Sequence, residues 1–376
     1  MISLRPNVRM GLVGLALTTA GMAASGEEPA LKHVVPKGLL IGAAVSERQV
    51  DGRDAIARRV VTRHFNSVTP ENLLKWRPIH PQPDEYVFEP ADRYVAFGED
   101  HGLTVIGHTL IWHPQTPDWV FVGKDGGRAD RETVLSRMRT HIEAVVGRYR
   151  GRIHGWDVVN EALNDDGTFR ETPWLETVGE EYIAKAFEYA HAADPEAKLY
   201  YNDYNLWKPE KRAAALRIVK QLRQRGLRID GVGEQAHYML DSPSIGEIEA
   251  TITALAGSRV QVMITELDID VLPRDPEMRG ADLPKQAEFL AETNLYPNGL
   301  PKAQQEQLAR RYADIFTLVM RHRDKLSRVT FWGVTDGQSW LNNFPLRGRV
   351  NYPLLFDRQG QPKPAFNAVV DVLKGS

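Results

Sequence analysis

The sequence contains no cysteine among its 376 residues. This absence excludes a disulfide framework, a thiolate zinc site and a cysteine nucleophile. No GxSxG segment follows an apolar run, so a serine-hydrolase triad is not favoured. The first expected strand is not followed by GxGxxG, and no GxxxxGK[ST] segment occurs, so the usual nucleotide-binding signatures are missing as well. Histidine, carboxylate and carboxamide side chains remain as the candidates for chemistry.

An excess of charge of either sign is also lacking. Lys and Arg number 47 against 49 Asp and Glu, a formal net charge of −2. This balance gives no electrostatic reason to expect binding to nucleic acid or to an anionic membrane. Hydrophobic residues make up 42% and charged residues 26%, proportions typical of a globular chain that buries a core.

Long hydrophobic runs are missing too, apart from a short one near the N-terminus. Arg5 and Arg9 precede an apolar run from Gly11 to Ala24, and small and polar residues follow. This pattern is typical of a secretory signal peptide, whereas a membrane span needs about 20 apolar residues. We therefore expect a signal peptide over 1–24, a short polar linker over 25–34 and a secreted or periplasmic protein. An uncleaved membrane anchor is the alternative.

Eight short apolar, β-rich runs alternate with longer amphipathic segments from residue 39 onward, which is typical of βα units and a parallel sheet. The expected strands are Leu39 to Val45, Ser67 to Glu71, Thr104 to Ile111, Ile153 to Val159, Lys198 to Asn202, Gly231 to Ala236, Gln261 to Leu267 and Arg328 to Val334. The expected helices include Asp130 to Tyr149, Glu180 to Ala193, Pro209 to Gly226 and Gln304 to Lys325. The strand starts are about 41 residues apart, which favours a single (β/α)8 TIM barrel of the α/β class over 35–376.

Polar residues follow seven of these strands. They are Glu71 and Asn72, His108, Asn160 and Glu161, Asn202 and Asp203, Gln235 and His237, Glu266 and Asp268, and Trp332. In a (β/α)8 barrel the carboxyl ends of all strands meet at one face, where active sites are built. We therefore expect these side chains to share one pocket.

Glu161 and Glu266 each close an apolar strand, where a carboxylate is costly to bury unless it is paired or functional. Two carboxylates that face each other across a barrel mouth are the minimal machinery of glycoside hydrolysis. Asp268 lies two residues after Glu266 and so shares its face of the strand. It can thereby orient His237, which in turn can hold Glu266.

Sugar rings stack on indoles, and their hydroxyls accept and donate hydrogen bonds. The tryptophans near strand ends are Trp112, Trp332 and Trp340, whereas Trp76, Trp119, Trp156, Trp174 and Trp207 are interpreted as packing residues. The polar groups available for hydroxyls are Glu71, Asn72, Lys75, His108, Gln115, Asn160 and Gln235. His108 and His113 are five residues apart, on opposite faces of an unbroken strand, so no metal site and no cofactor are expected.

Six segments in order resemble family-10 glycoside hydrolases, the retaining endo-β-1,4-xylanases. They are Thr69-Pro70-Glu71-Asn72 with Lys75-Trp76, Gly107 to His113, Trp156 to Ala162, Tyr201 to Asn205, Ile264 to Asp268 and Phe331 to Asp336. The similarity extends from about Leu39 to the segments Pro353 to Asp357 and Lys363 to Phe366, almost the entire mature chain.

The resemblance implies that Glu161 is the acid/base, that Glu266 is the nucleophile and that His237 and Asp268 hold Glu266. It places six residues around the sugar being cleaved, namely Lys75, His108, Trp112, Asn160, Gln235 and Trp332. Glu71, Asn72, Gln115 and Trp340 would bind the next sugar on the glycone side. The expected partners are xylan and xylo-oligosaccharides, with no nucleic acid, no membrane after signal cleavage and a monomeric chain.

Two other functions remain open from the residues. A glycosidase acting on glucan or mannan would keep both glutamates and differ around the sugar, whereas a carbohydrate-binding protein would keep the tryptophans without needing two facing glutamates. The stretch from Leu272 to Pro301 is long, and it either shapes the aglycone side or lies over the cleft.

Overall fold

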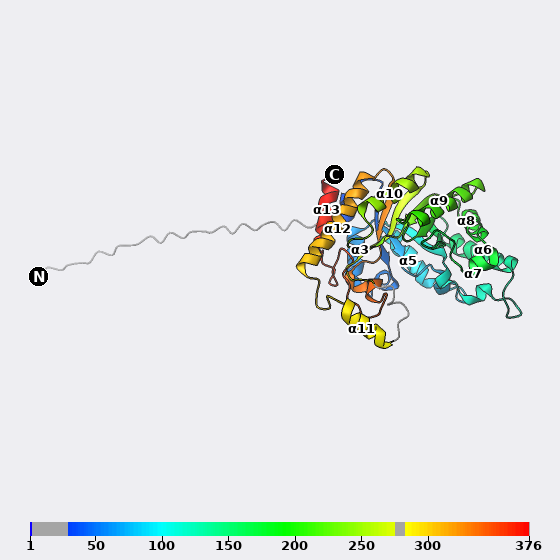
Figure 1. Ribbon diagram of the computed structural model, residues 1–376, viewed down its shortest axis with the longest axis horizontal. Helices are drawn as coiled ribbons and strands as arrows, with labels where there is room; N and C mark the ends of the chain where they lie inside the picture. The colour runs from blue at the N-terminus through cyan, green and yellow to red at the C-terminus, as the bar shows by residue number, and fades with distance from the viewer. Residues whose placement is uncertain (2–28, 275–282, 376) are drawn as a thin grey trace.

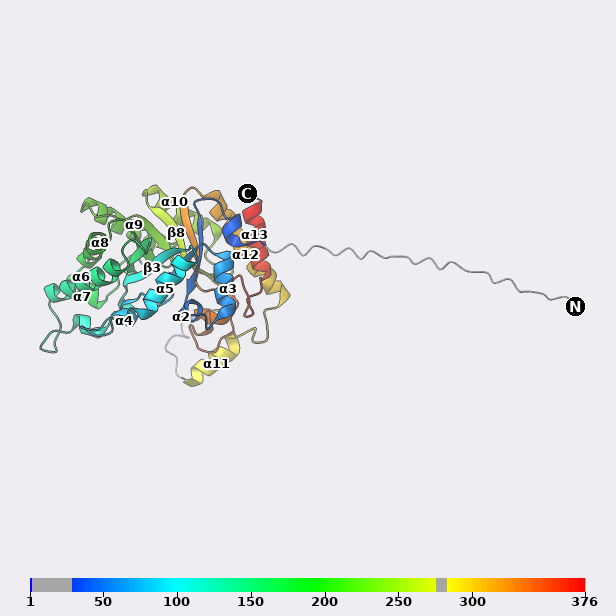
Figure 2. The same ribbon diagram turned by 180° about the vertical axis from the view of Figure 1, so that it is seen from behind.

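The computed structural model describes residues 1, 29–274 and 283–375, in which a central barrel of strands is surrounded by helices (Figure 1). Almost all of the expected signal peptide lies outside the described residues, so that expectation stays a prediction. Seen from behind, helices α3 and α5 cover the same barrel (Figure 2).

Eight parallel strands close the barrel, in the order β1, β2, β3, β4, β5, β6, β8, β9 and back to β1. A ninth strand, β7, is short and pairs with the carboxyl-terminal end of β8. The bounds are β1 Leu40–Val45, β2 Ser67–Pro70, β3 Thr104–Ile111, β4 Gly155–Asn160, β5 Lys198–Asp203, β6 Gly231–Glu234, β7 His237–Met239, β8 Gln261–Asp270 and β9 Leu326–Phe331. The predicted (β/α)8 fold is confirmed.

Helices connect successive strands and pack outside them. Their bounds are α1 Leu31–Val34, α2 Glu47–Val50, α3 Ala55–His64, α4 Trp76–Ile79, α5 Glu89–Asp100, α6 Arg131–Arg148, α7 Pro173–Val178, α8 Glu181–Ala193, α9 Pro209–Gln224, α10 Ile245–Gly257, α11 Leu283–Thr293, α12 Lys302–Arg321 and α13 Pro364–Lys374. All four helices named from the sequence are present, with ends displaced by at most four residues.

Local sequence explains where several helices start. The Asp130 carboxylate accepts a hydrogen bond from the Thr133 amide at the start of α6, and Ser244 and Glu247 form a capping box at the start of α10. Both arrangements satisfy amide groups that the first helical turn leaves unpaired. Pro209 stands at the first position of α9, where its missing N–H costs nothing.

The expected sixth strand, Gly231 to Ala236, is interrupted in the structure. β6 ends at Glu234, Ala236 has a φ of 67°, and the chain resumes as β7 at His237. The left-handed conformation turns the chain out of the β6 ladder, and His237 then pairs in register with Asp268. The last strand also ends early, at Phe331 instead of Val334, since Gly333 has a φ of 126° and redirects the chain.

The expected linker over 25–34 is wrong for its last four residues. Leu31–Val34 form helix α1, which packs against β1, α3 and α13. The Leu31 side chain is fully buried in the main hydrophobic core. Val34 and Val35 pack against the same core, so apolar side chains anchor this segment to the barrel.

Two glycines inside the barrel allow close contacts beneath the pocket. A Cβ atom at Gly107 on β3 would lie 2.1 Å from the Trp156 ring, and one at Gly233 on β6 would lie 2.4 Å from Asn202 Oδ1. Trp156 and Asn202 are both fully buried. The interior is therefore packed up to the floor of the pocket.

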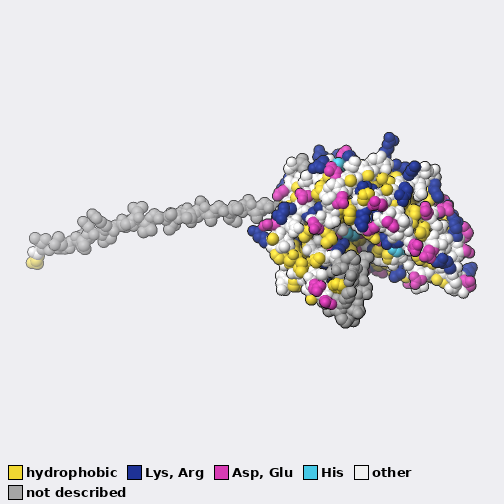
Figure 3. Space-filling model, viewed as in Figure 1, with side chains coloured by type: hydrophobic (Ala, Val, Ile, Leu, Met, Phe, Trp, Pro, Cys, Tyr) yellow, Lys and Arg dark blue, Asp and Glu magenta, His cyan; other side chains and the backbone are white. Residues whose placement is uncertain are grey.

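Basic and acidic side chains are interspersed on the face seen in Figure 3, where neither sign forms a continuous region. Within residues 29–274 and 283–375, none of the helices is both long and apolar enough to cross a bilayer.

Candidate active site

A cleft of about 890 Å³ opens at the carboxyl ends of the strands. It brings together thirteen of the fourteen residues predicted from the sequence: Glu71, Asn72, Lys75, His108, Trp112, Gln115, Asn160, Glu161, Gln235, His237, Glu266, Trp332 and Trp340. The fourteenth, Asp268, is fully buried directly behind His237. The polar strand ends therefore share one pocket, except Asn202 and Asp203, which are fully buried and do not line it.

Glu161 follows the last residue of β4. Its φ is 57°, a left-handed conformation that non-glycine residues rarely adopt. Its amide still donates to the Asn202 carbonyl of the neighbouring strand, at 2.9 Å. The turn therefore occurs at Glu161 itself, which places its half-buried side chain in the cleft.

Glu266 lies within β8 and is only 4% exposed. His237 Nε2 contacts Glu266 Oε2 at 3.2 Å, and His237 Nδ1 contacts Asp268 Oδ1 at 3.0 Å. The other Asp268 oxygen accepts a hydrogen bond from the Trp340 indole at 2.7 Å. One buried carboxylate thus fixes both the histidine behind Glu266 and an indole of the cleft wall.

His237 carries a proton at neutral pH. Burial alone lowers the pKa of its imidazole, but the charges and hydrogen bonds of Asp268 and Glu266 outweigh burial and raise the pKa to about 10. Both ring nitrogens then donate, one to each carboxylate. Glu266 therefore faces a cation on one side.

Amide side chains connect the two glutamates. Gln235 Nε2 donates to Glu161 Oε1 at 3.1 Å, and Asn160 Nδ2 donates to the same oxygen at 3.2 Å. Asn202 Nδ2 lies between Asn160 Oδ1, at 2.9 Å, and Glu266 Oε1, at 2.8 Å. The Thr265 hydroxyl donates to Asn202 Oδ1 at 2.6 Å. Both carboxylates therefore belong to one hydrogen-bond network.

Lys75, in the loop between β2 and α4, places a buried ammonium group in the wall of the cleft. Its ammonium donates to Asn72 Oδ1 at 3.1 Å and lies 4.4 Å from the centre of the Trp112 ring. Burial lowers the pKa of Lys75, an effect that the charges of Glu266, Glu71 and Glu161 oppose. Burial likewise raises the pKa of Glu71, against the influence of Lys75.

His108 lies on β3 beneath the same cleft and is 2% exposed. Its Nδ1 contacts Asp157 Oδ2 at 2.9 Å, and its ring stands edge-on to Trp332 at 5.3 Å between ring centres. Asp157 therefore fixes the orientation of the imidazole, which leaves Nε2 as its second polar atom.

Sequence reasoning missed several residues of this site. Asp157 is buried beneath it, and the cleft lining also contains His113, Pro114, Asp165, Arg170, Tyr204, Asn205, Arg274, Phe344 and Pro345; Asn202 was expected in the pocket but not as a buried connector. A signal was available for the residues around Asn202, since they follow a predicted strand. Arg170 carries no such signal, because it lies near the end of the loop between β4 and α7, away from any strand end.

The tryptophans divide largely as expected. Trp76, Trp156 and Trp174 are at most 1% exposed within the core, and Trp119 and Trp207 pack against it. Trp340 lies in a short 3-10 helix in the loop after β9 and not at a strand end.

The described part of the stretch from Leu272 to Pro301 adjoins the loop that carries Trp340. Asn294 Oδ1 accepts from the Val350 amide at 2.9 Å, and the Tyr296 carbonyl accepts from the Tyr352 hydroxyl at 2.7 Å. Arg274, at its start, lines the cleft. This stretch therefore packs against the loop that follows Trp340, and its role at the cleft stays a prediction; residues 275–282 lie outside the described part.

Among the residues that the structure describes, no cluster of three or more histidine, aspartate or glutamate side chains is arranged to hold a metal ion.

A closed (β/α)8 barrel with two glutamates in one cleft, flanked by indoles and carboxamides, defines a carbohydrate-cleaving enzyme. The chain belongs to glycosyl hydrolase family 10, which matches residues 30–372.

Known relatives cover nearly the whole chain. It is 42% identical to endo-1,4-β-xylanase A of Xylanibacter ruminicola, over 95% of this chain and 97% of that protein. It is also 42% identical to endo-1,4-β-xylanase B of Paenibacillus barcinonensis, over 92% and 99%. A solved family-10 endoxylanase from a sugarcane soil metagenome is 44% identical, with a TM-score of 0.86 over 92% of this chain and 99% of that one.

Proposed function

We propose that this protein is a retaining endo-β-1,4-xylanase, with Glu161 as acid/base and Glu266 as nucleophile. The observation that carries the proposal is that both carboxylates lie in one cleft and share one amide network, with a histidine in contact with Glu266 and not with Glu161. The relatives named above are xylanases, which supports xylan as the substrate.

The first step is attack by ionised Glu266 on the anomeric carbon, while protonated Glu161 donates its proton to the departing oxygen. His237 and the amide of Asn202 hold the two Glu266 oxygens, which orients the carboxylate. The sugar oxygen leaves as a hydroxyl, and a glycosyl ester remains on Glu266.

In the second step Glu161, now a carboxylate, removes a proton from a water molecule that attacks the same carbon. The ester bond to Glu266 breaks, and both glutamates return to their starting states. Gln235 and Asn160 donate to one Glu161 oxygen, so that oxygen is held while the other is available for proton transfer.

The substrate preference rests on the wall that faces the sugar. Xylose lacks the hydroxymethyl arm of glucose and mannose, so a closed wall at that position favours xylan. Trp340 donates to Asp268 and packs at a tilt against Phe344 with 4.6 Å between ring centres, while the Lys75 ammonium lies over the Trp112 ring. Both side chains are therefore held in place and do not yield readily to a larger sugar.

The experiment is reducing-sugar release from xylan, carboxymethyl-cellulose and mannan by the chain and by Glu266→Ala. We expect internal cleavage of xylan alone and a loss of about 10⁴-fold or more in the variant. The control is Glu132→Ala, which removes an exposed glutamate of α6 and should leave activity unchanged. Preference for glucan or mannan would refute the substrate, and an inactive wild-type chain would favour a carbohydrate-binding protein.

We also propose that the protein is exported, on the strength of the basic and apolar N-terminal sequence, and that it acts as a monomer. Expression of the full chain in a bacterium, followed by N-terminal sequencing and sedimentation, tests both. Cleavage between residues 21 and 25 is expected, and an intact N-terminus in the membrane fraction would contradict export.

A further inference from the structure

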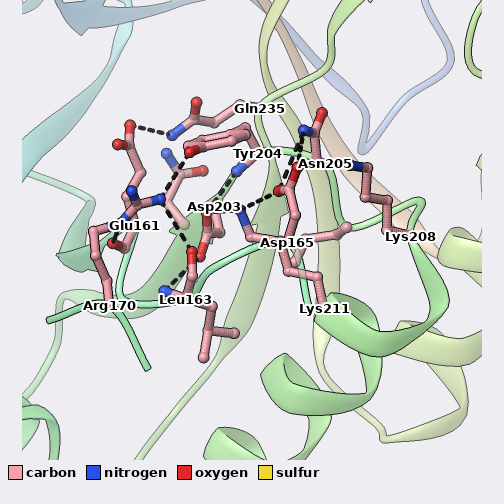
Figure 4. Close-up of polar contacts among 12 residues, drawn as sticks. Glu161, Leu163, Asp165, Arg170, Asp203, Tyr204, Asn205, Lys208, Lys211 and Gln235 are labelled. Atoms are coloured by element: carbon pink, nitrogen blue, oxygen red, sulfur yellow. Dashed lines mark hydrogen bonds and ion pairs between the residues drawn. The ribbon is translucent and has the colours of Figure 1, made fainter. Parts of the chain in front are cut away.

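Arg170 contacts the main chain of Glu161 and the cleft wall beyond it at the same time (Figure 4). Its Nε donates to the Glu161 carbonyl at 3.2 Å. Its Nη2 donates to the Leu163 carbonyl at 3.1 Å and to the Tyr204 hydroxyl at 2.7 Å. One guanidinium therefore joins the turn at the acid/base to the end of β5.

The carbonyl that accepts from Arg170 belongs to Glu161, whose backbone has an unusual left-handed conformation. A φ of 57° is unfavourable for glutamate and persists only when neighbouring groups hold it. The Glu161 amide is bound to Asn202, and its carbonyl is bound to Arg170. Because the main chain sets the direction of the side chain, Arg170 contributes to where the Glu161 carboxyl points.

Tyr204, the other partner of Arg170, is held in place by Lys211 and Asp203. The buried ammonium of Lys211 lies 3.6 Å from the centre of the Tyr204 ring and 3.0 Å from Asp203 Oδ1. The Tyr204 amide donates to the same Asp203 oxygen at 2.9 Å. Tyr204 and Arg170 both line the cleft on the Glu161 side, which is where the leaving group must lie when Glu161 protonates it.

Arg170 forms no ion pair with a carboxylate within residues 29–274 and 283–375. Its N–H groups are used instead on two carbonyls and a phenol, an arrangement that depends on the planar fork of the guanidinium. Arg217 also holds this loop, since its Nη2 donates to the Gly167 carbonyl at 3.0 Å. Holding the loop therefore does not by itself distinguish Arg170 from Arg217. Only Arg170 reaches both Glu161 and the leaving-group wall.

We propose that Arg170 is a positioning residue that aligns the proton donor Glu161 with the leaving group held at Tyr204. The inference rests on the proposed function, because it requires Glu161 to be the acid. Arg170 would act in the step in which the glycosidic bond breaks. Its effect on the rate of that step depends on how much proton donation the leaving group needs.

The test uses two aryl β-xylobiosides that place an aromatic ring on the same side of the cleft. Dinitrophenolate departs without a proton, whereas phenolate needs one. For Arg170→Met we expect kcat/KM to fall about 10- to 100-fold on the phenyl substrate and to stay within about 3-fold on the dinitrophenyl substrate. Retained activity on the latter also shows that the variant is folded with Glu266 in place.

Arg217→Met is the matched control, since it removes an arginine contact to the same loop, and we expect both substrates to react as with the wild type. Arg170→Lys keeps the charge but cannot reach three acceptors with one geometry, so it should retain most of the phenyl-specific defect. Equal losses on both substrates, no loss on either, or full rescue by lysine would overturn the proposal.

Glu161→Ala separates this inference from the proposed function. If that variant shows no dependence on the leaving group, Glu161 is not the acid and the proposed mechanism fails together with the inference. If Glu161→Ala shows the dependence and Arg170→Met does not, the mechanism stands and only the role of Arg170 is refuted.

Discussion

Asp268 illustrates how one side chain coordinates two parts of the site. Its two oxygens bind different partners, the His237 imidazole and the Trp340 indole. His237 in turn holds Glu266, and Trp340 lines the cleft. The position of Glu266 and the shape of the cleft therefore depend on the same buried carboxylate.

We expect Asp268→Asn to lower kcat/KM on xylo-oligosaccharides about 10- to 100-fold, because the amide cannot accept from both donors and removes the charge that keeps His237 protonated. Steady-state kinetics measure this effect. Trp340→Phe removes only the indole donor and should cost less than about 10-fold. A fully active Asp268→Asn variant would show that the Asp268 carboxylate is dispensable.

At this scale the sequence predicted which residues share the pocket but not all of their contacts. The two-residue spacing of Glu266 and Asp268 correctly predicted one common face. Asn202 was missed as a connector because its role depends on the register of three strands. Asn160 lies opposite Asn202 across β4 and β5, and a single sequence does not reveal that register.

Among the elements, the strand that carries His237 shows how local conformation sets a site. Alternation predicted one strand from Gly231 to Ala236, but Ala236 turns the chain and starts β7. No glycine or proline marks this turn, so sequence pattern could not locate it. Its result is that His237 lies directly beside Asp268.

Gly233 on β6 offers a test of the packing beneath the site. We expect Gly233→Ala to destabilise the fold by about 1–3 kcal/mol and to lower kcat at least about 10-fold, because its methyl group would displace Asn202. Urea unfolding and steady-state kinetics measure the two effects.

The matched control is Gly147→Ala on α6, where a Cβ meets no atom within 4 Å. This change should leave activity intact and stabilise the fold by about 0.5–1 kcal/mol through helix propensity. Similar behaviour of the two variants would contradict a packed floor beneath the cleft.

For the molecule as a whole, the proton on His237 makes the free energy of unfolding depend on pH in the alkaline range. Its pKa rises from 6.5 to about 10 on folding, so the folded state keeps a proton that the unfolded state loses. This stabilisation is complete below about pH 6.5 and is lost as the pH rises through about 10. The free energy of unfolding should therefore decline between pH 7 and 10.

Urea unfolding at pH 7, 8.5 and 10 measures this decline, with His237→Gln as the comparison. The variant should be less stable at pH 7, and its stability should change less over the interval. The pKa of Asp203 is raised by burial to about 6 and that of Glu234 to about 7, so both act mainly below this interval. Parallel curves for the two proteins would refute the assignment.

The pairing of β1 with β9 orders the folding of the chain in time. Leu40 lies opposite Arg328, so one edge of β1 has no partner until the ribosome has made nearly all of the protein. The barrel thus cannot close while its N-terminal half is being synthesised. Until β9 is made, the unpaired edge of β1 can pair with other chains, so the nascent protein is open to association for most of its synthesis.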